Sequence, residues 1–177
     1  MERQPHGLEA FAAARWVAGR IASMNVLVVY GSQFGNTERI ARLIGAALEP
    51  RHTVRVVGAK DARDLPGKAV DLLVVGAPTQ MFGRRLLVRS FLHGLKRQGF
   101  SNVAVAAFDT RMGTPTEKNA AASETIVARL QAAGCRLVVP PESFLVAGFT
   151  GPLVAGEEEH ATRWAGEIVE HMAVGAG

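Results

Sequence analysis

Short apolar runs alternate with longer amphipathic stretches from Asn25 onward. Five runs rich in β-branched residues are predicted to be strands: Asn25–Tyr30, Thr53–Val57, Asp71–Gly76, Asn102–Phe108 and Arg136–Val139, the last resuming around Ser143–Val146. The third run, DLLVVG, has almost no polar interruption, as expected of a strand that helices cover on both faces. This alternation of strands and helices indicates a parallel sheet in an α/β domain.

The stretches between these runs have helical periodicity. Helices are predicted at Asn36–Leu48, Leu86–Leu95, Thr116–Ala133 and Gly156–Met172. Gly134 is suited to cap the third of these helices, and three glutamates stand in the first turn of the last one, where the helix dipole favours negative charge. Pro140 and Pro141 remove donors from the fifth strand, which places it at an edge or a break of the sheet.

Residues 1–23 stand apart from the alternation. Their apolar side chains would form one helix that packs on the domain or on a partner: Leu8, Phe11, Trp16, Val17 and Ile21. Alternatively, the stretch is an upstream extension, and Met24 is the working start of a domain at 24–177. We favour the second interpretation.

Composition narrows the class of protein. The 177 residues suit one domain, and 48% hydrophobic with 20% charged residues is typical of a soluble globular protein. No apolar run approaches the roughly 20 residues of a membrane-spanning helix. Arg15 and Arg20 interrupt the stretch that a secretory signal would need, and the single cysteine, Cys135, suits a reducing compartment. A cytoplasmic location is expected.

The formal charge of +4 is spread along the chain without a basic block, so nucleic-acid binding is not expected. The five histidines lack metal-ligand spacing, and no metal site is predicted. Trp164 and Ile168 lie four residues apart on the last helix, which predicts core packing for Trp164. Cys135 is expected to be a small buried side chain.

The polar loop between the first strand and the first helix carries the strongest chemical signal. At such a junction, backbone N–H groups and the positive end of the helix dipole converge, so a phosphate can bind without lysine or arginine. Ser32, Asn36 and Thr37 add side-chain donors, and Gly35 allows close approach of the backbone. The alternative is an ordinary turn with an N-cap at Ser32 or Asn36.

This loop, SQFGNT, resembles the phosphate-binding loop of the flavodoxin family, Ser/Thr-x-Thr-Gly-x-Thr. Ser32, Gly35 and Thr37 match, whereas Phe34 replaces the middle threonine and removes one donor, so weakened phosphate binding is expected. The resemblance extends roughly from Asn25 to Met172. It implies a three-layer α/β/α sandwich, a five-stranded parallel sheet of order 2-1-3-4-5, and flavin mononucleotide (FMN) as the cofactor.

Two further loops fit this resemblance. The segment 76–83 is similar to the family's Gly-x-Pro-Thr loop against the flavin ring, where Met81 or Phe82 would supply the apolar face. The segment 108–113 would close over the other side of the ring, with Arg111 either near the flavin N1/O2 edge or on the surface, paired with Asp109. The predicted cofactor-binding residues are Ser32, Gln33, Phe34, Gly35, Asn36, Thr37, Pro78, Thr79, Gln80, Met81, Phe82, Gly83, Asp109, Thr110 and Arg111.

Other classes of protein with this architecture need residues that this chain lacks in the corresponding loops. The first strand ends without the acidic residues of a receiver domain, the first loop has no nucleophilic cysteine, and no Gly-x-Gly-x-x-Gly or Walker motif follows a strand.

Three functions stay open. The leading interpretation is an FMN-binding electron carrier with no catalytic residue, which exchanges electrons with a redox partner protein. The second is an FMN enzyme that takes hydride from NAD(P)H and reduces a quinone or oxidises a porphyrinogen, because carriers of this family are typically acidic and this chain is basic. The third is a flavin-free regulatory or interaction domain, which Phe34 would explain. A monomer and a homodimer are both compatible with the sequence.

Overall fold

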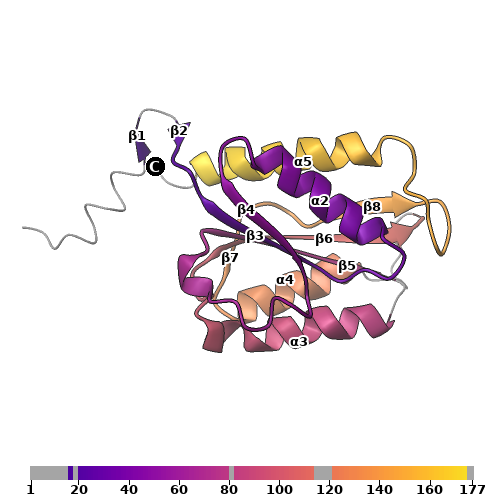
Figure 1. The fold of residues 1–177 in the computed structure, drawn as a ribbon, viewed down its shortest axis with the longest axis horizontal. Helices are drawn as coiled ribbons and strands as arrows, with labels where there is room; N and C mark the ends of the chain where they lie inside the picture. Colours follow the sequence, from indigo (N-terminus) through magenta and orange to yellow (C-terminus); the bar gives the residue numbers. More distant parts are fainter. Residues whose placement is uncertain (1–15, 18–19, 80–81, 114–120, 175–177) are drawn as a thin grey trace, which may run out of the picture.

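The parallel sheet predicted from the alternation is present in the computed structural model, which describes residues 16–17, 20–79, 82–113 and 121–174 (Figure 1). Its strands are β3 (Asn25–Tyr30), β4 (Thr53–Gly58), β5 (Leu72–Pro78), β6 (Ala104–Met112), β7 (Arg136–Leu137) and β8 (Glu142–Val146). The order is β4-β3-β5-β6-β7, and β8 also pairs with β6. Every pairing in this sheet is parallel. The predicted order 2-1-3-4-5 is therefore confirmed.

Helices cover both faces of the sheet. They are α2 (Asn36–Leu48), α3 (Phe82–Gln98), α4 (Ala122–Ala132) and α5 (Glu157–Val174), with a short 3₁₀ turn at Gly67–Ala69. In Figure 1, α2 and α5 lie on one face and α3 and α4 on the other. Alternate residues of each strand therefore point into two separate apolar cores, and every residue of β5 is buried.

Aromatic rings fill the core beneath α5. Phe108 stands edge-on to Phe144 and Trp164, with ring centroids 5.8 and 6.2 Å away. Trp164 is only 2% exposed, which confirms its predicted place in the core. The Phe108 ring also covers Gly76 of β5 so closely that a Cβ atom added there would lie 2.1 Å from it. Gly76 thus leaves the space that the ring occupies.

The fifth predicted strand is broken in the way that its prolines suggested. β7 pairs with the start of β6, at Ala104 and Val105, and β8 pairs with its end, from Phe108 to Met112. Pro140 and Pro141 lie between the two pieces. Both pieces lie along one neighbour, so the break does not change the order of the sheet.

Several element boundaries shift by a few residues from prediction, and two of the shifts affect the predicted site. β6 continues to Met112 because β8 supplies ladder partners for Phe108 to Met112, so the predicted loop at 108–113 is strand up to Met112. α3 begins at Phe82, so Phe82 and Gly83 belong to a helix and not to a loop. Gln80 and Met81 lie outside the described residues.

Four of the described residues in the N-terminal segment form strands. β1 (Trp16–Val17) and β2 (Arg20–Ile21) form a small antiparallel pair, and β2 contacts α5. The helix considered for this segment is therefore wrong at these four residues. Within the described part of the chain, no helix combines the length and apolar character that crossing a bilayer requires.

His52 gives the fold a pH dependence that can be measured. Its side chain is buried, and Nδ1 accepts a hydrogen bond from the backbone N–H of Met24 at 3.3 Å. Burial, and secondarily the charge of Arg51, lowers the pKa of His52 below its usual range. The unfolded chain therefore binds the proton more readily, and stability is lost as the pH falls below about 6.5, the ordinary histidine pKa.

We expect the free energy of unfolding to drop more between about pH 7.5 and about pH 5 in the wild type than in His52→Asn. The amide oxygen of asparagine can accept the same hydrogen bond without titrating. Urea unfolding at both pH values measures the difference. Equal losses of unfolding free energy in both proteins would contradict the assignment of this pH dependence to His52.

Candidate functional site

A small cavity opens at the carboxyl edge of the sheet, where the predicted ligand loops converge. Its volume is about 30 Å³, and it is lined by residues from the β3–α2 loop, the ends of β5, β6 and β8, and the segment after β8: Ser32, Gln33, Phe34, Asn36, Thr37, Pro78, Thr110, Val146 and Phe149. One enclosed water molecule needs roughly 10–15 Å³ of such space. The cavity therefore has room for roughly two water molecules, and it lies where the loop expected to bind phosphate meets the ends of the strands.

Gly35 shapes the wall of this cavity formed by the first loop. It precedes α2 in a left-handed conformation, with φ of 86°, which glycine adopts without strain. Its N–H donates to Ser32 Oγ at 3.1 Å, which tightens the turn. The next three backbone N–H groups, of Asn36, Thr37 and Glu38, have no acceptor among the described residues. These free donors, together with the helix dipole, make this end of α2 suited to an anion.

Side chains that sequence analysis assigned to phosphate binding also support the loop. Thr37 Oγ1 and Thr110 Oγ1 share a hydrogen bond of 2.7 Å, and both residues are buried. Asn36 Nδ2 donates to the carbonyl of Thr150 at 3.0 Å. One amide hydrogen of Asn36 and one proton of the two threonine hydroxyls stay available for a ligand.

Charges beside the cavity compensate one another. Glu38, in the first turn of α2, accepts hydrogen bonds of 2.7 and 2.9 Å from Arg42. The Arg42 guanidinium, and to a smaller extent the Tyr30 hydroxyl, lowers the pKa of Glu38. Burial, followed by the neighbouring Glu38, raises the pKa of Tyr30. Glu38 is thus held as a paired carboxylate, and its charge opposes an incoming anion less than an unpaired one would.

The end of β6 divides its side chains between the two faces of the sheet. Thr110 points to the cavity beside α2, whereas Asp109 accepts hydrogen bonds at Oδ2 from the N–H and hydroxyl of Ser123, in the first turn of α4. Thr79 Oγ1 accepts the N–H of Ala122 at 3.2 Å in the same turn. Asp109 and Thr79 therefore fix the start of α4 on the face of the sheet opposite α2.

Arg111 is completely buried, with 0% of its surface exposed, so the alternative of a surface arginine is wrong. It lies two residues after Asp109 on the same strand and therefore faces the α4 side. Residues 80–81 and 114–120, which flank the predicted ring site, lie outside the described part of the chain. That Arg111 reaches the flavin stays a prediction.

The segment after β8 is the part of the site that sequence analysis missed. Val146 and Phe149 line the cavity, and Thr150 accepts the hydrogen bond from Asn36. The sequence does contain a sign of a loop at this place, because Gly148, Gly151 and Pro152 favour turns and the segment follows a parallel strand. Its place at the same sheet edge as the other loops followed from the topology.

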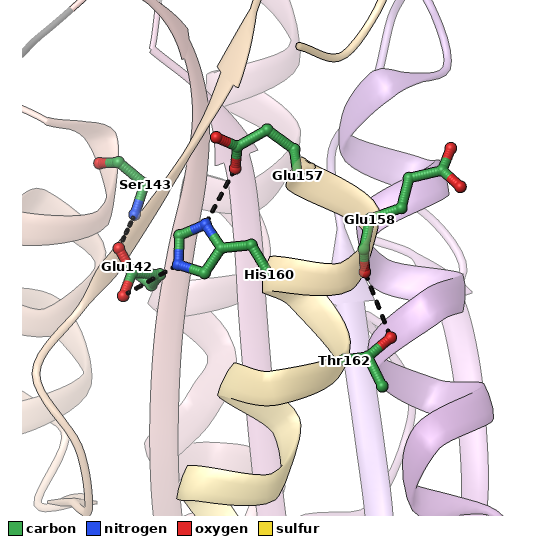
Figure 2. A network of polar contacts seen from close by, with 6 residues as sticks. All are labelled: Glu142, Ser143, Glu157, Glu158, His160 and Thr162. Carbon is green, nitrogen blue, oxygen red and sulfur yellow. Dashed lines mark hydrogen bonds and ion pairs between the residues drawn. The ribbon is translucent and has the colours of Figure 1, made fainter. Parts of the chain in front are cut away.

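A polar network joins the start of β8 to the first turn of α5 (Figure 2). His160 contacts Glu157 Oε2 through Nδ1 at 3.0 Å and Glu142 Oε2 through Nε2 at 3.6 Å. Its imidazole ring also packs on Phe144, with centroids 4.8 Å apart. The first turn of α5 is therefore held against β8. Within the described residues, no group of acidic, histidine or cysteine side chains could hold a metal ion.

Comparison with known proteins agrees with this geometry. The sequence model of the flavodoxin family matches residues 28–170. No curated protein sequence matches the chain at a significant level.

Solved structures share the fold. Oxidised flavodoxin 1 from Bacillus cereus superposes with a TM-score of 0.66 at 19% identity, over 83% of this chain and 98% of that one. A flavodoxin from the domain Archaea gives a TM-score of 0.65 at 21% identity, over 83% and 97% of the two chains. A flavodoxin, WrbA-like protein from Agrobacterium tumefaciens gives 0.59 at 20% identity, over 88% and 100%. At these identities the likeness is one of fold.

Proposed function

The chain belongs to the flavodoxin family, and from this membership we propose that it binds FMN at the carboxyl edge of the sheet and transfers electrons. The free N–H groups at the start of α2, directly after the left-handed Gly35, carry the proposal. They lie in the loop that follows the first strand of the domain, and they need no basic side chain to bind a phosphate. FMN, when bound, supplies the redox chemistry through its ring.

The residues present suit a terminal phosphate. Asn36, Thr37 and Glu38 would bind its oxygens through their backbone N–H groups, and Thr37 or Thr110 would add one hydroxyl proton. Phe34 lines the cavity where a hydroxyl donor is expected in the family. We therefore expect phosphate binding through the backbone, with less help from side chains.

The visible absorption spectrum tests the proposal. Purified protein is mixed with FMN, freed of excess ligand and compared with the untreated protein. Retained bands near ~370 and ~450 nm, which are properties of oxidised flavin, are the expected result. A protein that stays colourless would contradict FMN binding and would favour a flavin-free interaction domain of the same fold.

An FMN-dependent oxidoreductase is the second candidate. The positive formal charge of +4 and the likeness in fold to a WrbA-like protein motivate it. If the FMN-loaded protein is reduced by NAD(P)H and then reoxidised by quinone without a second protein, it is an enzyme. If it reacts with neither and exchanges electrons only with a partner protein, it is a carrier.

A further inference from the structure

The segment after β8 folds back as a short hairpin. Val146 bridges Leu153 in antiparallel fashion, and the N–H of Ala147 donates to the carbonyl of Pro152 at 2.8 Å. Gly148 and Gly151 close the turn with a hydrogen bond of 3.0 Å. In Figure 1 this hairpin extends beyond the sheet next to the start of α2. We call residues 148–151 the hairpin tip.

The hairpin tip is in close contact with the first turn of α2. Asn36 Nδ2 donates to the Thr150 carbonyl, and a Cβ atom added at Gly151 would lie 2.6 Å from Asn36 Oδ1. Only glycine permits this approach, because Gly151 also has a φ of 105°. The tip is therefore held over the phosphate cavity by a specific contact.

Two phenylalanines form the outer wall of the cavity. Phe34 from the first loop and Phe149 from the hairpin tip have ring centroids 5.8 Å apart and planes inclined by 59°. The residues are 43% and 57% exposed, so both rings lie at the border between the cavity and solvent. Both rings line the cavity itself.

An open surface groove also borders Phe34. Its volume is about 560 Å³, and it runs along α2 past Arg39 and Arg42. Phe34 and Asn36 line both the groove and the cavity. Phe34 therefore borders both the small cavity and this open groove, whose Arg39 and Arg42 are paired with Glu158 and Glu38.

We propose that the Phe34–Phe149 pair selects the ligand by its phosphate end: it admits a flavin that ends in a phosphate monoester and excludes one whose phosphate carries an adenylate. This inference rests on the proposed function. A substituent on the phosphate must leave the small cavity, and the paired rings and the tip held by Asn36 stand in its path. Without one ring, the substituent gains access to the open groove along α2. Such discrimination is the difference between the affinities for the two flavins. Removing a ring can therefore reduce it without weakening FMN binding.

The ratio of the dissociation constants of flavin adenine dinucleotide (FAD) and FMN tests the proposal. Equilibrium dialysis with each flavin is applied to the wild type, Phe149→Ala, Phe34→Ala and two controls. Phe149→Tyr retains a ring, and Val154→Ala removes an exposed apolar side chain near the hairpin without touching the cavity lining. Thermal unfolding of each protein without flavin verifies that it is folded.

We expect the wild type to bind FMN at least ~100-fold more tightly than FAD, and either alanine variant to narrow that ratio by at least ~tenfold. The two controls should retain the wild-type ratio. FMN binding with an unchanged ratio in both alanine variants would overturn the selection and leave the proposed function intact. Equal affinities of the wild type for both flavins would overturn it in the same way. If neither the wild type nor any variant binds FMN, both the selection and the proposed function are wrong.

Discussion

Replacing Gly76 with alanine is expected to lower the free energy of unfolding by about 3 kcal/mol. The added Cβ would lie 2.1 to 2.4 Å from three atoms of the Phe108 ring. That ring cannot move aside cheaply, because Phe144 and Trp164 pack against it. A loss of this size is a large part of the roughly 5–15 kcal/mol that holds a typical domain folded.

The same substitution at Gly166 is a matched control. Gly166 lies on the exposed side of α5, and nothing stands within 4 Å of an added Cβ. Alanine there should raise stability by about 0.5–1 kcal/mol, since it favours the helix. Urea unfolding measures both changes. In the double variant Gly76→Ala/Phe108→Leu part of the loss should return, and a Gly76→Ala protein as stable as the wild type would contradict the packing described.

Replacing Gly35 with aspartate is expected to weaken FMN binding about 100-fold relative to asparagine at the same position. Asparagine and aspartate have nearly the same shape, and both tolerate the left-handed backbone better than most residues. A Cβ at Gly35 meets nothing within 4 Å, so neither side chain is excluded sterically. The two variants therefore differ by one negative charge beside the proposed phosphate, at a site that has no lysine or arginine among its lining residues.

FMN titration at low and high salt measures this effect, and riboflavin, which lacks the phosphate, serves as the control ligand. The gap between the two variants should narrow at high salt, because exposed charges are screened. It should vanish for riboflavin. Equal FMN affinities of the aspartate and asparagine variants would place the phosphate elsewhere.

The interior of the domain was predictable because its signals are local. The bounds of β3 and α2 match their predictions, since an unbroken apolar run and a regular helical period need no distant information. The broken fifth strand was equally readable, because Pro140 and Pro141 act through their own backbone.

The rest of the candidate site depends on contacts between distant segments. Asp109, Thr110 and Arg111 look like loop residues in the sequence, yet they are buried in β6 because Ser123, Thr37 and the β8 ladder lie beside them. Phe149 and Thr150 reach the first loop from more than a hundred positions away, and no local pattern reveals that contact. The loop predicted to bind phosphate lines the cavity, whereas the neighbouring hairpin with Phe149 and Thr150 was not predicted to reach it.

The two margins of the sheet bear on how this chain behaves at high concentration. A long, regular outer strand offers its unpaired backbone groups to a strand of another molecule, which is a common route to aggregation. Here one margin is β4, with the exposed charge of Arg55 in its middle, and the other is divided into β7 and β8 by Pro140 and Pro141. A strand that paired with β4 would have to accommodate the positive charge of Arg55. At the other margin, Pro140 and Pro141 offer no backbone N–H donors to a new strand. The described sheet therefore resists growth by strand addition at both margins.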